Sequence, residues 1–117
     1  MYTSLTYILK TNVLTFVETK LFTSLVGQSL SDDEYAALQQ ALMASPDAGD
    51  GVRGSGGVRK LRWGLPGRGK RGGILVIYDL RLRQGEVWML TLYAKNEADS
   101  IPGHVLKKIN EEIDGGA

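Results

Sequence analysis

The chain has 117 residues and a formal net charge of +1, and its mass of 12.8 kDa is that of one small domain. Its 43% of hydrophobic residues can form a core, which excludes an intrinsically disordered chain, and no apolar run is long enough for a membrane-spanning helix. The lack of cysteine excludes disulfides, zinc–thiolate sites and thiol nucleophiles, and the single histidine, His104, excludes a metal site built from several histidines.

Residues 1–14 are apolar and have Lys10 as their only charged residue. They lack the early positive charge and the small-residue cleavage site of a secretory signal. Three interpretations of this extension stay open: an additional edge strand, a disordered tail, or an artefact of start-codon choice. A short strand is then predicted over 14–18, followed by a short helix with one apolar face made of Leu21, Phe22, Leu25 and Val26.

The clearest helix begins after Ser31. This serine is a favourable N-cap, Glu34 follows at capping-box spacing, and the acidic first turn complements the helix dipole. The helix carries an apolar stripe that is typical of core packing, consisting of Tyr35, Leu38, Ala41 and Leu42. Pro46 marks the end of the helix.

Three consecutive strands and a closing helix are predicted in the second half of the sequence. The strands cover 58–63, 73–82 and 86–95, and the preceding segment, 47–57, has the glycine- and aspartate-rich composition of turns. The helix over 102–114 has an apolar face made of Val105, Leu106, Ile109 and Ile113. The order β-α-α-β-β-β-α predicts an α+β fold, a small antiparallel sheet with helices packed on one face.

Positive charge is concentrated in residues 51–78, which carry seven basic side chains and no acidic one, whereas the segments before and after have net charges of −4 and −2. The seven are Arg53, Arg59, Lys60, Arg62, Arg68, Lys70 and Arg71. The same segment holds nine of the fifteen glycines. Because like charges repel, this composition favours a surface that faces phosphate over a solvated basic loop.

Lys60 and Arg62, referred to below as the basic pair, are the strongest candidates for function. They stand two residues apart on one predicted strand, so both side chains leave the same face, whereas Arg59 points to the other face. A phosphate could lie between them. RNA cleavage requires a 2′-OH to be deprotonated, a pentavalent phosphate to be stabilised and a leaving oxygen to be protonated, and cationic side chains can do all three. The residues alone are compatible with cleavage or with binding.

The usual catalytic sets are missing. The sequence has no Cys–His pair, and its scattered serines with one histidine do not suggest a Ser-His-Asp triad. The segment GRGKRGG (67–73) lacks the GKS or GKT ending of a phosphate-binding P-loop. We therefore expect no cofactor and no metal.

Three segments together resemble one known family. They are GDGVRGSGGVRKLRW (49–63), GRGKRGG (67–73), and IYD with LTLYAKNE (77–79 and 90–97). In combination they resemble the HigB-type branch of the RelE/ParE toxin superfamily from bacterial type II toxin–antitoxin systems, in order over about residues 16 to 113. Residues 15–114 are therefore expected to form the toxin domain, after an N-terminal extension over 1–14.

The resemblance implies a small antiparallel sheet flanked by helices that acts as an mRNA interferase in the cytoplasm. Such a toxin enters the ribosomal A site and cuts the bound mRNA by attack of the 2′-OH on the adjacent phosphate, without a metal. The implied partner is a cognate antitoxin, usually a helix-turn-helix protein. The toxin–antitoxin complex is expected to bind operator DNA only through the antitoxin. Neither a cofactor nor a membrane is implied.

By position, the resemblance implies two sets of site residues. The expected catalytic residues are Lys60, Arg62, Arg71 and Lys95, and the expected RNA-binding residues are Arg59, Arg68, Lys70 and Asn96. No metal-binding residue is expected.

Leu75 and Asp79 depart from the family pattern. RGGILVIYD (71–79) has Leu75 where the family commonly has a phosphate-binding arginine, and Asp79 where it has an apolar or aromatic residue. Because a leucine cannot stabilise the charge of a phosphorane, either Arg71 or Arg68 supplies that charge or the toxin is attenuated. If Leu75 lies on the face of the basic pair, Leu75→Arg is expected to increase cleavage at unchanged stability; otherwise Leu75 only packs in the core.

Two alternatives stay open. One is a toxin-fold protein that binds RNA or the ribosome with weak or no cleavage, and the other is a ParE-like inhibitor of DNA gyrase. The basic pair favours an RNA-facing role, because gyrase inhibition through protein contacts needs no such cluster.

Overall fold

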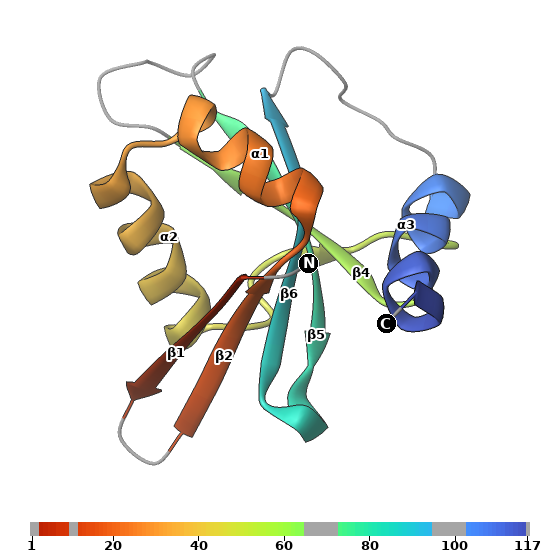
Figure 1. Cartoon of the computed structure of the whole chain (residues 1–117), viewed down its shortest axis with the longest axis horizontal. Coiled ribbons are helices and arrows are strands. Elements are labelled where there is room, and N and C mark those ends of the chain that lie inside the picture. Colours follow the sequence, from red (N-terminus) through yellow and green to blue (C-terminus); the bar gives the residue numbers. More distant parts are fainter. Residues whose placement is uncertain (1–2, 10–11, 65–72, 95–102, 117) are drawn as a thin grey trace.

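The computed structural model describes residues 3–9, 12–64, 73–94 and 103–116 (Figure 1). In chain order the elements are β1 (Thr3–Leu9), β2 (Asn12–Glu18), α1 (Lys20–Ser29), α2 (Asp32–Ala44), β3 (Asp50–Gly51), β4 (Val58–Trp63), β5 (Ile74–Arg81), the 3₁₀ turn η1 (Leu82–Gln84), β6 (Glu86–Ala94) and α3 (Gly103–Gly116). The predicted α+β fold is confirmed, with β1 and the short β3 added to the predicted order. Of the three interpretations of residues 1–14, the structure shows the edge strand.

The strands form one sheet in the order β1-β2-β6-β5-β4-β3. The three predicted consecutive strands are antiparallel as expected, and among all neighbouring strands only β2 and β6 are parallel. The chain leaves β2 through α1 and α2, enters the sheet again at the opposite edge, and returns through consecutive antiparallel strands. β6 therefore ends beside β2 and runs in the same direction.

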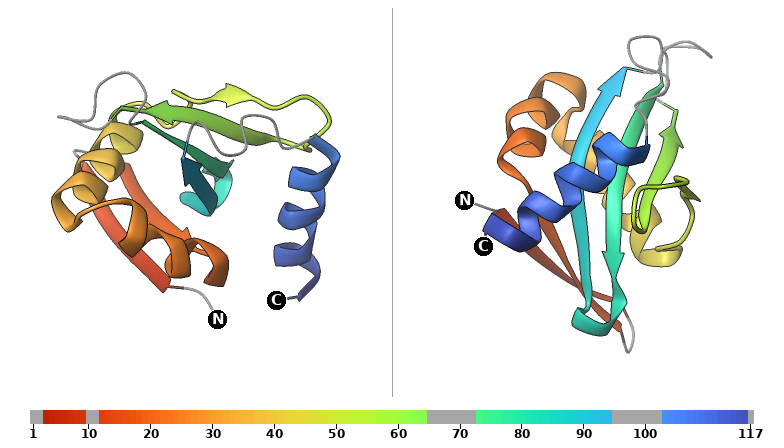
Figure 2. Two further views of the ribbon diagram at one scale, coloured as in Figure 1. Left: turned by 90° about the horizontal axis from the view of Figure 1, so that it is seen from above. Right: turned by 90° about the vertical axis from the view of Figure 1, so that its right-hand side faces the viewer.

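Helices cover both faces of this sheet (Figure 2). α1 and α2 lie on one face and α3 lies on the other, so the expectation that all helices pack on one face is wrong for α3. The physical reason is β5, in which every residue from Ile74 to Asp79 is buried and successive side chains alternate between the faces. A strand that is apolar on both faces needs cover on both sides.

Two hydrophobic clusters fill the two layers. The larger joins β2, β5 and β6 to α1 and α2, and its buried members include Phe16, Phe22, Leu38, Leu42, Val76, Tyr78 and Met89. The smaller joins the other face to α3 and consists of Val58, Ile77, Leu90 and Leu106, with Val52, Trp88, Tyr93 and Ile109 packed against it. The predicted apolar stripe of α2 contributes to the larger cluster. Of the predicted apolar face of α3, Leu106 and Ile109 contribute to the smaller cluster, whereas Val105 is exposed.

The pairing of β5 with β6 contains one β-bulge. Ile77 pairs with Thr91, but Tyr78 pairs with Met89, so Leu90 is an additional residue in β6. The contributions of β6 to the clusters consequently change their spacing at the bulge: Val87, Met89 and Leu92 belong to the larger cluster, and Trp88, Leu90 and Tyr93 belong to the smaller.

The start of α2 agrees with the sequence. The backbone N–H of Glu34 donates to Ser31 Oγ (3.1 Å), and the backbone N–H of Ser31 donates to Glu34 Oε1 (2.8 Å). Both bonds of the predicted capping box are therefore present, and the cap at Ser31 is confirmed.

A buried tyrosine holds the turn between α2 and β3. The Tyr78 hydroxyl accepts a hydrogen bond from the Gly49 N–H (2.8 Å) and donates one to the Pro46 carbonyl (2.9 Å). Arg59 Nη1 donates to the carbonyls of Gly49 (2.7 Å) and Asp47 (3.3 Å). Burial raises the pKa of Tyr78 above its ordinary value of 10.0, against the hydrogen bond from Gly49, which lowers it. Folding thus favours the protonated hydroxyl, a contribution that is present below pH of about 10 and lost above it.

We expect Gly49→Ala to destabilise the fold by about 1–3 kcal/mol. An added Cβ would come within 2.8 Å of the Tyr78 hydroxyl and 3.1 Å of the Lys60 carbonyl. The matched control is Gly51→Ala, since Gly51 is exposed and an added Cβ there would meet no described atom within 4 Å. Urea titration gives the two free energies of unfolding, and equal values would show that the contact with Tyr78 does not constrain this turn.

Candidate nucleic-acid interface

The basic pair lies on one face of β4, as the sequence predicts. Lys60 pairs with Ile77 of β5, which pairs with Thr91 of β6. Directly opposite residues of antiparallel strands share a face, so these three side chains form one row across the sheet. Lys60 is half-buried in this row.

A second row runs parallel to the first. Arg62 pairs with Leu75, and Leu75 pairs with Tyr93. Arg62 is exposed, Leu75 is fully buried and Tyr93 is half-buried. The two rows thus place an ammonium group, a guanidinium group and, two strands away, a hydroxyl-bearing ring on one face of the sheet, the face opposite α1 and α2.

Leu75 fits both of its interpretations. It lies on the face of the basic pair, and it is a core residue with 0% of its surface exposed. The expectation that Leu75→Arg leaves the stability unchanged is therefore not supported, because a guanidinium group at a fully buried position loses its hydration. We now expect this substitution to lower the free energy of unfolding.

Arg59 is separated from the basic pair. It lies on the other face of β4, where its guanidinium group donates to the carbonyls of Asp47 and Gly49. These bonds give Arg59 a role in the turn after α2 rather than beside Lys60. Asp50 of β3 pairs with Lys60 across the strand, and its carboxylate partly offsets the positive charge of the interface.

Five expected site residues lie outside the described residues: Arg68, Lys70, Arg71, Lys95 and Asn96. The strand residues nearest to these segments are Trp63, Ile74 and Ala94, which pair with one another across β4, β5 and β6. Both segments are thus attached to the sheet next to Arg62.

The glycines before β4 have a local structural reason. Gly54, Gly56 and Gly57 have φ angles of 77°, 77° and 110°, which other residues rarely adopt. Buried Ser55 closes the turn, since its Oγ accepts from the Val58 N–H (3.0 Å) and donates to the Val52 carbonyl (2.6 Å). These glycines shape a tight turn, so their number is not by itself an indication of a phosphate-binding loop.

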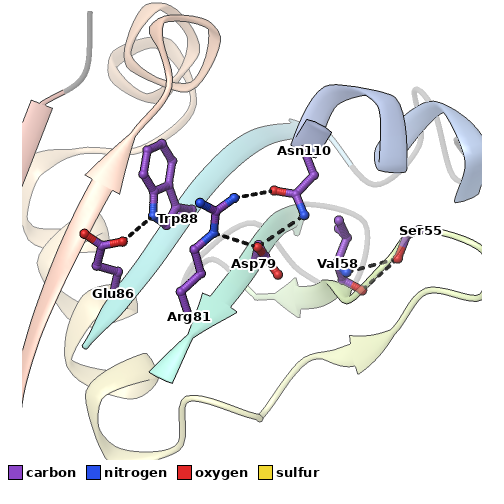
Figure 3. Close-up of polar contacts among 7 residues, drawn as sticks. All are labelled: Ser55, Val58, Asp79, Arg81, Glu86, Trp88 and Asn110. Carbon is purple, nitrogen blue, oxygen red and sulfur yellow. Dashed lines mark hydrogen bonds and ion pairs between the residues drawn. The ribbon is translucent and has the colours of Figure 1, made fainter. Parts of the chain in front are cut away.

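Sequence reasoning missed a polar network beneath α3 (Figure 3). Arg81 Nε donates to Asp79 Oδ2 (3.1 Å), Arg81 Nη2 donates to Asn110 Oδ1 (3.1 Å), and Asn110 Nδ2 donates to Asp79 Oδ2 (3.2 Å). The Arg81 guanidinium also lies over the Trp88 ring, 4.7 Å from its centroid, and Trp88 Nε1 donates to Glu86 Oε1 (2.9 Å). The hydrogen bonds of Asn110 connect α3 to β5, and they give Asp79 a structural role.

Asp79 could have been found from the sequence. It interrupts an apolar strand and stands two residues before Arg81, so both side chains share a face of β5. Asn110 could not, because its contribution depends on where α3 docks.

Among the described residues, no group of three or more histidine, aspartate or glutamate side chains could hold a metal ion. No helix in that part of the chain is both long and apolar enough to cross a membrane. A comparison of the chain with models of known protein families finds no match. The functional argument therefore depends on the residues themselves.

We expect Asp79→Ala and Asn110→Ala each to destabilise the protein by about 1–3 kcal/mol, because each removes a hydrogen-bond acceptor of Arg81 at a mostly buried position. In the ion pair, the side chains of Arg81 and Asp79 are only 17% and 10% exposed. Lys108→Ala, at an exposed position on α3, serves as the control and should change little. Urea titration of the single and double variants should give a loss smaller than the sum of the two, whereas additive losses would contradict a shared network.

Proposed function

We propose that this protein is the toxin of a type II toxin–antitoxin system and cleaves mRNA in the ribosomal A site. The observation that carries the proposal is the shared face of Lys60 and Arg62, with Tyr93 on the same face two strands away from Arg62. The resemblance to HigB-type toxins over the same segments supports it.

The proposed reaction is an attack within the RNA chain. The 2′-oxygen loses its proton and bonds to the adjacent phosphorus, and the 5′-oxygen leaves with a proton, which yields a 2′,3′-cyclic phosphate and a 5′-hydroxyl. Exposed Arg62 can grip the phosphate through two parallel N–H bonds, and half-buried Lys60 adds a point charge. Both stabilise the additional negative charge of the pentavalent phosphate.

The rate is a second part of the proposal. Leu75 occupies the position where the family commonly has a phosphate-binding arginine, and its complete burial makes it unable to contact a bound phosphate. Loss of one preorganised charge typically lowers a rate by roughly 10²–10³. We propose an attenuated enzyme unless Arg71 or Arg68 supplies that charge. The same observation favours the second candidate, a protein that binds RNA or the ribosome with weak or no cleavage.

The proposed partners follow from the toxin function. They are the ribosome with mRNA in its A site and a cognate helix-turn-helix antitoxin, through which the complex would reach operator DNA, all in the cytoplasm. The antitoxin must cover the basic pair or block ribosome entry, which favours acidic or apolar residues in its contact segment.

Salt dependence tests the interface. Lys60→Ala and Arg62→Ala should each reduce the slope of log K against log salt for RNA binding by about one unit, because each removes one phosphate contact. Arg83→Ala is the matched control, since Arg83 is exposed on η1 at the opposite end of β5. Fluorescence anisotropy with a single-stranded RNA at several salt concentrations measures the slope. Unchanged slopes in both variants would remove β4 from the interface.

Cleavage tests the reaction. We expect the Lys60→Ala, Arg62→Ala double variant to lose ribosome-dependent mRNA cleavage by more than about 10²-fold, with Arg83→Ala unaffected. The assay uses purified ribosomes programmed with mRNA and maps 2′,3′-cyclic phosphate ends. RNA binding without cleavage by the wild-type chain would select the second candidate. Growth arrest that persists in the double variant with intact mRNA would indicate a target other than RNA, such as DNA gyrase.

A further inference from the structure

β1 forms one end of the sheet and pairs with β2 on one side only. All seven residues of the strand pair with β2, from Thr3 with Glu18 to Leu9 with Asn12, and the register has no shift. Among the residues that the structure describes, no strand lies beyond β1 (Figure 1). Its outer edge thus carries backbone N–H and C=O groups that another strand could pair with.

β1 lacks the features that protect an edge strand. Its sequence, TSLTYIL, contains no charged residue, proline or glycine, and its pairing contains no bulge. The opposite edge of the sheet is different, because β3 has two residues, Asp50 and Gly51, and both are exposed. The sheet therefore has one edge that is suited to pairing and one that is not.

We propose that β1 pairs in an antiparallel manner with β1 of a second copy of this chain, around a two-fold axis at Thr6. This is the only antiparallel register that pairs all seven residues. It places Thr6 opposite Thr6, Leu5 opposite Tyr7 and Ser4 opposite Ile8 of the other copy. A strand without charge is complementary to itself in this register, because no like charges meet.

The register also continues the main hydrophobic layer. Within one chain, Leu5 pairs with Phe16 and Tyr7 pairs with Leu14, and both of these β2 residues belong to the larger cluster. In this register the paired backbone positions Phe16–Leu5 of one copy are followed directly by the positions Tyr7–Leu14 of the other. The two-fold axis is then perpendicular to the sheet, and α1 and α2 of both copies lie on the same side.

Such an assembly closes at two copies. An open-ended chain of copies would form only if β1 of one copy paired with β3 of the next, but β3 offers only two residues. Pairing of β1 with β1 uses both suitable edges at once. The basic pair lies on β4, which is separated from β1 by three strands, so this inference does not depend on the proposed function.

A charge exchange at Thr6 tests the register. Sedimentation equilibrium of the wild-type chain should show a dimer. Thr6→Lys and Thr6→Glu, each alone, should raise the dimer Kd by about fivefold or more, because two like charges meet on the axis. An equimolar mixture of the two variants should recover the wild-type Kd, and Ala37→Lys, at an exposed position of α2, should leave it unchanged.

Hydrogen exchange supplies a second measurement in case a variant folds poorly. In the wild-type chain, the amides of Thr3–Leu9 should become more protected as protein concentration rises through the Kd, whereas those of β4 should not. The proposal would be overturned by a wild-type chain that stays monomeric at 100 times the protein concentration of the cleavage assays. Pairing of β1 only with a strand of another protein would overturn it as well. A dimer whose Kd is the same in both Thr6 variants would overturn it equally.

Discussion

Burial of β5 on both of its faces constrains every other element of the fold. Each fully buried aliphatic side chain contributes about 1.5–3 kcal/mol, and β5 buries four in succession, from Ile74 to Ile77. α1 and α2 exclude water from one face and α3 from the other. The candidate interface depends on the same strand, because Lys60 and Arg62 are held in position by their pairing with Ile77 and Leu75. The buried strand β5 thus fixes the positions of the basic pair on β4.

Elements with a local signal could be predicted from the sequence. The capping box defined the start of α2, and alternation of side chains defined β4 over the same residues as in the structure. The parallel pairing of β2 with β6 and the docking face of α3 could not be predicted. Both depend on contacts between residues far apart in the chain, for which periodicity carries no information. β3 was missed because two residues are too few to show a period.

In the candidate site, too, features within one strand could be predicted, whereas features that depend on distant residues could not. That Lys60 and Arg62 share a face follows from the two-residue period of a single strand, and so does the separation of Arg59. Asp79 was noted only as a departure from a family pattern, and its partner Asn110 stands 31 residues later on α3. Its role became clear only with the placement of that helix. The glycines near β4 were interpreted through phosphate binding, but their positive φ angles show that backbone geometry already requires them.

The bulge at Leu90 divides β6 into two segments of opposite phase. Before it, even-numbered residues such as Trp88 lie on the α3 side of the sheet, and after it odd-numbered residues such as Tyr93 do. Deletion of Leu90 would remove the bulge and leave Tyr93 on the α3 side, because the remaining residues would then alternate regularly. Regular pairing of the full-length strand, without the bulge, would instead turn Tyr93 toward the helices α1 and α2, away from Arg62. The bulge therefore decides which face of the sheet Tyr93 joins, without a change in any side chain.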